Sequence, residues 1–163
     1  IRLSLVGSEM CIRDSISTVT EKIFMPMLHF ATPHEAEDAF YLAFTRANIT
    51  AMMQVWLDAQ HIECIHPAGP RLSGPEAIRQ AWQQIFAQGE RLQFQVQRQQ
   101  CTQTASLAIH SVNEHITQTE QPGATALVLA TNIYELTADG WRMIVHHASP
   151  AQTLAHETTS IIH

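Results

Sequence analysis

Two histidines of this sequence stand where an imidazole could do acid–base chemistry. His66 ends an alternating run directly before a proline-containing turn, and His147 ends a second alternating run. An imidazole has an unperturbed pKa of about 6.5, so either residue could act as a general base or donate to a ligand oxygen. We predict both as catalytic candidates. For His66, the alternative is a structural role as a strand-end histidine bonded to a turn carbonyl.

His147 has a histidine neighbour, and the two cannot serve one site. On a strand, His146 and His147 point to opposite sides of the sheet. Alternation groups His147 with Trp141, Met143 and Val145, and this apolar set predicts His147 as the inward residue. Strand curvature or a β-bulge would reverse the assignment.

The preceding strand carries small side chains followed by polar ones on a single face. Val128 and Ala130 leave space there, and the amide of Asn132 and the phenol of Tyr134 could orient a ligand. The alternative is that Tyr134 fills the core with its hydroxyl at the rim. Trp56, at helical spacing among apolar neighbours, is a core residue that could also form a pocket wall. The predicted ligand-binding residues are Trp56, Ala130, Asn132 and Tyr134.

Two carboxylates are further acid–base candidates. Glu114 shares a strand face with His110 and Val112, where an inward carboxylate would need a partner or a raised pKa. Asp58 follows a helix and could act as a base if it is buried. The alternative for Asp58 is an exposed carboxylate at a helix end.

Ten histidines and three cysteines do not form a recognisable metal motif. No His-Glu pair is followed by the second histidine of HExxH, and no two cysteines form CxxC. Within each pair, His61 with His66 and His110 with His115, the side chains fall on opposite strand faces. The sequence also lacks a dinucleotide fingerprint, a phosphate loop and a Ser-His-Asp pattern. We therefore predict neither a metal nor a cofactor.

The elements that must position these residues follow from the apolar periodicity. A helical period appears first, with Thr32 and Asn48 as N-caps, and a strand period of two replaces it near residue 91. Helices followed by long antiparallel strands predict an α+β domain with helices on one face of a curved sheet. The predicted helices cover 33–47, a short segment after Asn48, and 75–88; the predicted strands cover 61–66, 71–73, 91–101, 106–119 and the hairpin around 138–140.

Composition limits the class of protein. The 163 residues suit one domain, and the net charge of −6 argues against nucleic acid or an anionic membrane as partner. No apolar run approaches the roughly 20 residues of a membrane span, and unpaired cysteines fit a reducing compartment, so we expect a cytoplasmic protein. We expect residues 1–24 to be a non-native or disordered leader, 25–150 the domain and 151–163 a tail.

Two segments resemble the SnoaL-like domain of the nuclear transport factor 2 and ketosteroid isomerase superfamily. IECIHPAGPRLSGPEAIRQAWQQIF is similar to its strand, hairpin and Trp-bearing helix, and ATNIYELTADGWRMIVHHASP is similar to its final hairpin. The resemblance covers about residues 33–150. It implies a cone-shaped, curved antiparallel sheet around the N-terminal helices, a mostly apolar pocket inside the cone, and a homodimer through the outer sheet face. The Tyr/Asp oxyanion pair of ketosteroid isomerase is not found here.

Three functions are compatible with this sequence. We favour a SnoaL-like domain that binds a small apolar molecule in a pocket inside the cone. The alternative is a cofactor-free acid–base enzyme (an isomerase, cyclase or hydrolase-like protein) acting on an apolar carbonyl or polyketide-like substrate. In the third function, bulky side chains fill the cone, and the domain only binds other proteins or copies of itself.

Overall fold

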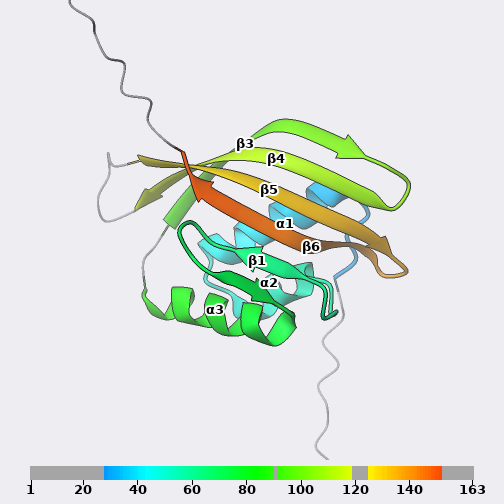
Figure 1. Ribbon diagram of the computed structural model, residues 1–163, viewed down its shortest axis with the longest axis horizontal. Coiled ribbons are helices and arrows are strands. Elements are labelled where there is room, and N and C mark those ends of the chain that lie inside the picture. The colour runs from blue at the N-terminus through cyan, green and yellow to red at the C-terminus, as the bar shows by residue number, and fades with distance from the viewer. Residues whose placement is uncertain (1–27, 90–91, 119–124, 152–163) are drawn as a thin grey trace, which may run out of the picture.

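A six-stranded sheet curves around three helices in the computed structural model, which describes residues 28–89, 92–118 and 125–151 (Figure 1). The α+β class with N-terminal helices inside a curved sheet is confirmed. The predicted leader lies outside the described residues, as does all of the predicted tail except Ala151. The elements are α1 (Pro33–Thr45), α2 (Ile49–Val55), β1 (Glu63–Ile65), β2 (Arg71–Ser73), α3 (Pro75–Ala87), β3 (Leu92–Gln103), β4 (Leu107–Gln118), β5 (Thr125–Thr137) and β6 (Gly140–Pro150). No helix among these is both long and apolar enough to cross a membrane.

The first two helices begin at the polar residues that the sequence indicated. The Thr32 hydroxyl accepts from the backbone N–H of Glu35 at 3.2 Å, and the Glu35 carboxylate accepts from the N–H of Ala31 at 2.8 Å. The first bond satisfies an N–H group that the first turn of α1 leaves without a helical partner, and the second binds the Glu35 carboxylate to the residue before the cap. The Asn48 side chain accepts from the N–H of Ala51 in the same way and starts α2.

The sheet is mixed rather than wholly antiparallel. Its order is β2-β1-β6-β5-β4-β3, in which β3 to β6 form an antiparallel meander. The short β1–β2 hairpin adds to the free edge of β6, and β1 runs parallel to β6 with Cys64 opposite His146. This pairing places the end of β1, where His66 follows, beside the histidines of β6.

A β-bulge interrupts the pairing of β5 with β6. The register passes from Ile133 opposite Val145 to Tyr134 opposite Met143, which leaves Ile144 without an opposite residue. One extra residue shifts the alternation of a strand by one position, so side chains beyond it change face.

The bulge decides which of the two adjacent histidines faces the helices. Met143 and His146 are both buried although they are three residues apart, and His147 is exposed on the outer face. The prediction that His147 is the inward residue is therefore wrong. It followed strict alternation from Trp141, which the bulge breaks between Met143 and His146.

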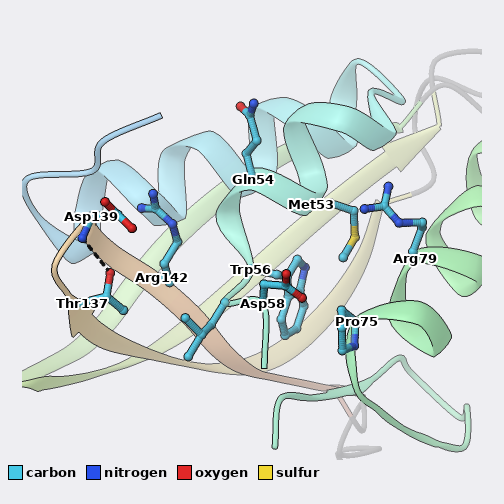
Figure 2. Close-up of a pocket in the computed structure, with 10 residues that line it drawn as sticks. Met53, Gln54, Trp56, Asp58, Pro75, Arg79, Thr137, Asp139 and Arg142 are labelled. Carbon is cyan, nitrogen blue, oxygen red and sulfur yellow. Dashed lines mark hydrogen bonds between the residues drawn. The ribbon is translucent and has the colours of Figure 1, made fainter. Parts of the chain in front are cut away.

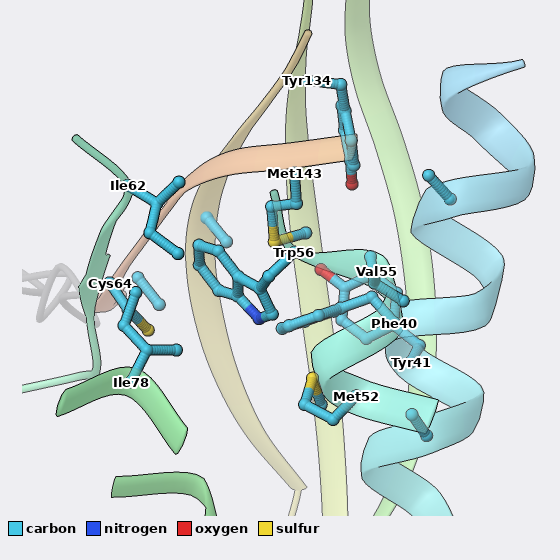
Figure 3. Close-up of a cluster of buried hydrophobic side chains, with 14 of the residues drawn as sticks. Phe40, Tyr41, Met52, Val55, Trp56, Ile62, Cys64, Ile78, Tyr134 and Met143 are labelled. Atoms are coloured by element: carbon cyan, nitrogen blue, oxygen red, sulfur yellow. The ribbon is translucent and has the colours of Figure 1, made fainter. Parts of the chain in front are cut away.

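The interior is packed around the ring of Phe40 in α1. This ring lies 6.5 Å from that of Trp56, 5.5 Å from that of Trp82 and 5.0 Å from that of His146, measured between centroids. Figure 3 shows Phe40 of α1 and Met52 of α2 in the same cluster as Met143 of the sheet. Burying each large apolar side chain contributes about 1.5–3 kcal/mol, so this cluster holds the helices on the sheet.

Gly140 marks a close backbone approach that a side chain would disturb. Its φ is +98°, and a Cβ there would lie 2.6 Å from the carbonyl oxygen of Phe30, which also accepts from the N–H of Trp141. We expect Gly140→Ala to lower the free energy of unfolding by more than the about 1–2 kcal/mol that a left-handed conformation alone costs. Urea denaturation measures this loss.

The matched control is Gly89→Ala. Gly89 has a φ of +73° with no atom within 4 Å of the added Cβ, so it should show only the conformational cost. Equal losses at the two positions would contradict a tight contact between Gly140 and Phe30.

Candidate functional site

A carboxylate from α1 lies at the centre of the inner sheet face. Glu37 is fully buried, and its Oε1 accepts from His110 Nδ1 at 3.1 Å, from Asn132 Nδ2 at 3.1 Å and from the Tyr134 hydroxyl at 3.4 Å. Its Oε2 accepts from Arg98. Burial alone would raise the pKa of Glu37, but the hydrogen bonds from His110, Asn132 and Arg98 outweigh it and the pKa is lowered. Glu37 is therefore ionised.

Asn132 connects this carboxylate to a histidine of β6. Its Nδ2 donates to Glu37, and its Oδ1 lies 2.7 Å from Nδ1 of His146. An ionised carboxylate only accepts, so the amide must turn its NH₂ group to Glu37 and its oxygen to His146. His146 then carries its proton on Nδ1 and keeps a lone pair on Nε2. Burial lowers the pKa of His146 to about 3, which keeps the ring neutral near pH 7.

A second carboxylate, Glu114 of β4, is held by a tyrosine of α1. The Tyr41 hydroxyl donates to Glu114 at 2.6 Å and accepts from Asn132 at 3.2 Å. Burial raises the pKa of Glu114 to about 7; the hydrogen bond from Tyr41 opposes the shift and the charge of Glu37 adds to it. The inward carboxylate expected from the sequence thus has both a partner and a raised pKa.

His66 lies beside His146, on the side of α3. Its ring centroid is 6.3 Å from that of His146 and 4.7 Å from that of Trp82, and its Nε2 is 3.6 Å from the sulfur of Cys64. Burial lowers the pKa of the half-buried His66. The neighbouring imidazoles of His66 and His146 are therefore both neutral near pH 7, and we call this pair the histidine wall.

Two indole nitrogens close to this wall have no hydrogen-bond acceptor among the described residues. They are Nε1 of Trp56 and Nε1 of Trp82, and both side chains are buried. Figure 3 shows the nitrogen of Trp56 turned into the core toward Phe40, whose ring contacts both indoles. A buried donor without a partner costs about 1–3 kcal/mol, so each position suits an acceptor atom of a ligand.

A cleft of about 360 Å³ opens on the other side of Trp56 (Figure 2). Its volume lies in the range of small-molecule sites. Asp58 is exposed there, in agreement with the structural alternative for that residue. Besides Trp56, the cleft is lined by Met53, Gln54, Leu57, Asp58, Pro75, Arg79, Thr137, Asp139 and Arg142.

The predicted ligand-binding residues lie at three different places. Asn132 and Tyr134 belong to the Glu37 network, and Trp56 separates the interior from the cleft. Ala130 is buried on β5, opposite Val112 of β4. Their roles in binding a ligand stay predictions.

The most important residue, Glu37, was missed by the sequence reasoning. Glu37 and Tyr41 are four residues apart, so they share one side of α1, and a carboxylate beside an apolar stripe was the available signal. Arg98 continues the inward alternation of Phe94 and Val96 on β3, and a charge at such a position needs a partner.

Comparison with known proteins shows the family and the fold. The SnoaL-like domain family matches residues 34–153. A solved structure from Thiobacillus denitrificans, described as a candidate calcium/calmodulin-dependent protein kinase type II association domain, is 40% identical with a TM-score of 0.73, covering 77% of this chain and 99% of that one. A candidate dehydratase of the NTF2-like family from Streptomyces avermitilis is 32% identical with a TM-score of 0.67, covering 72% and 92%.

A curated relative is longer than this chain. The F-box protein SKIP8 of Arabidopsis thaliana is 26% identical over 110 residues, which cover 68% of this chain. The match spans only 46% of that relative, so this chain corresponds to less than half of its length.

Glu114 should give stability an unusual pH dependence. Its folded-state pKa of about 7 lies above the ordinary 4.5, so between these values the unfolded chain releases a proton that the folded chain keeps. The contribution of Glu114 to the free energy of unfolding is therefore at its maximum below about pH 4.5 and falls as the pH rises toward 7. We expect wild type to lose about 2–3 kcal/mol relative to Glu114→Gln between about pH 5 and pH 8.

Urea unfolding of both proteins across this range measures the difference. The variant keeps an acceptor for Tyr41, and the titrations of His66 and His146, whose lowered pKa values act in the opposite direction, are common to both proteins. Parallel pH profiles would show that Glu114 ionises normally.

Proposed function

Because the chain belongs to the SnoaL-like domain family, we propose that it binds a small molecule inside the cone, between the inner sheet face and the helices. The observation that carries this proposal is the pair of buried indole N–H groups of Trp56 and Trp82 without an acceptor. Buried donors are nearly always satisfied in native proteins. A ligand oxygen would satisfy them.

The groups around the indoles define the chemistry of this ligand. Each indole N–H suits a carbonyl or carboxylate oxygen, and the lone pair on Nε2 of His146 suits a hydroxyl hydrogen. The ring of Phe40 is fully buried between the two indoles and His146, so a ligand at this place would displace part of that apolar packing and contact the same rings. With a pKa of about 3, His146 is a weak base at neutral pH, which favours a binding role over proton abstraction. These features support an apolar carbonyl compound as the ligand.

A second candidate function is cofactor-free acid–base catalysis on the same class of compound. Glu114 favours it, because a carboxylate with a pKa of about 7 can exchange a proton at neutral pH. His147 lies on the outer face and cannot reach an interior substrate, so His66 and Glu114 are the remaining groups for this role. Glu114→Gln would abolish turnover and retain binding if the domain is an enzyme.

The interior site is tested with the indole N–H signals in a ¹H–¹⁵N NMR spectrum. We expect acetophenone, an apolar ketone, to shift the signals of Trp56 and Trp82 and to leave that of Trp141 unchanged. Trp141, the second residue of β6, donates its backbone N–H to Phe30 and serves as the internal control. Single Trp→Phe variants assign the three signals.

Benzoate is run in parallel, because a carboxylate would satisfy the same donors. The proposal of an interior binding site is contradicted if neither compound shifts the Trp56 and Trp82 signals, or if all three indole signals shift together.

We also propose that two copies of the chain pair through the outer face of the sheet. Ile109, Leu127 and Leu129 are between 38% and 46% exposed on β4 and β5, next to the glutamine-rich outer face of β3. Apolar side chains grouped on a sheet surface favour an interface. His147 lies on this face, in a shallow depression that Leu129 also lines. The relative from Thiobacillus denitrificans, described as an association domain, supports the same expectation.

Light scattering tests the dimer. The wild type should give about twice the 18.3 kDa chain mass, and Leu129→Glu should give the monomer, because a charge would be buried in the interface. Leu42→Glu is the control: Leu42 is 48% exposed, much like Leu129 at 46%, but lies on α1. A monomeric wild type, or equal dissociation by both variants, would contradict this interface.

A further inference from the structure

Two histidines and a cysteine from three elements meet at the surface end of the Glu37 network. The ligand atoms of His34, Cys101 and His110 all lie within 4.8 Å of one another. Cys101 of β3 pairs directly with His110 of β4, and the ring of His34, in the first turn of α1, lies 4.7 Å from the ring of His110. His110 is buried and the other two are exposed, so the cluster is anchored on the inside and open to solvent.

The contact with Glu37 fixes the orientation of His110. Its Nδ1 lies 3.1 Å from a carboxylate oxygen that can only accept, so Nδ1 carries the proton. The lone pair available to a metal is therefore the one on Nε2. Metal-binding histidines commonly donate their other N–H to a carboxylate, which fixes the ring and increases its basicity. Glu37 supplies this carboxylate.

The local charge favours a cation. Arg98 is a positive group whose charge acts on Cys101, and it is paired with both Glu37 and Asp38. These three residues together carry a charge of −1, so the arginine does not leave a net positive field. Burial and the charge of Glu37 raise the pKa of the Cys101 thiol, and Arg98 opposes this. In the free protein the sulfur therefore keeps its proton.

We propose that His34, Cys101 and His110 bind a divalent metal ion of the zinc class, with a fourth position for water or an external ligand. Two imidazoles and one thiolate are ligands that zinc prefers, in tetrahedral geometry with bonds of about 2.0–2.3 Å. Donor atoms are then about 3.3–3.6 Å apart. The exposed side chains of His34 and Cys101 can rotate to meet this distance while His110 stays fixed. On binding, the Cys101 thiol releases its proton to solvent as the sulfur–metal bond forms.

This site is independent of the proposed ligand site at the indoles. No local sequence motif marks this site, because its ligands come from one helix and two strands rather than from one segment.

The test is titration of the full, reduced chain with Co²⁺ as a spectroscopic substitute for zinc. We expect one Co²⁺ per chain, a near-ultraviolet thiolate-to-cobalt charge-transfer band, and displacement of the cobalt by Zn²⁺. Cys101→Ser should abolish the band. His34→Gln should weaken Co²⁺ binding by about tenfold or more. Both changes are at exposed positions, so the fold is retained, and acetophenone should still move the two indole signals.

Two variants serve as controls. Cys11→Ser should leave the band unchanged, and His147→Gln, which alters an exposed histidine on the outer face, should leave the affinity unchanged. The proposal is overturned if wild type shows no charge-transfer band, if the band survives in Cys101→Ser, or if His147→Gln weakens binding as much as His34→Gln does.

Discussion

A carboxylate in a protein interior costs several kcal/mol unless donors surround it, and the inner face of this sheet is organised around that requirement. Glu37 enters from α1, and its donors come from β3, β4 and β5. Each donor can reach the carboxylate only if the helix sits in one position along the strands. Apolar packing around Phe40 holds α1 on the sheet but would tolerate several positions of the helix along the strands. The Glu37 contacts select one of these positions.

The same carboxylate orients two histidines toward different surroundings. It binds Nδ1 of His110 directly and Nδ1 of His146 through Asn132, so each ring is left with its Nε2 lone pair. His110 belongs to the surface cluster with His34 and Cys101, and the ring of His146 packs against Phe40 in the interior. One buried carboxylate therefore orients the rings of two separate histidines, and burial keeps one of them, His146, neutral.

Local signals in the sequence determined most of the fold. Thr32, Asn48 and the change from helical to strand period predicted the helices and long strands, because caps and periodicity act over a few residues. The orientation of His146 was not predictable, since the bulge at Ile144 depends on how two strands pack against the helices. Glu37 was missed for a similar reason: its environment is made by three strands distant in sequence. Glu114 was predictable because its face was already defined by Val112 and His110.

The parallel pairing of β1 with β6 has a consequence for the order in which the domain assembles. It joins the strands most distant in sequence, whereas β3 to β6 pair with successive neighbours. Contacts between distant segments close late, because more chain entropy must be lost before they form. The meander can thus be complete while the β1–β2 hairpin is still detached, and His66 meets His146 only when it docks. Because the hairpin joins the sheet through three residue pairs of β1 with β6, its detachment would separate His66 from His146 and leave the pairing of β3 to β6 intact.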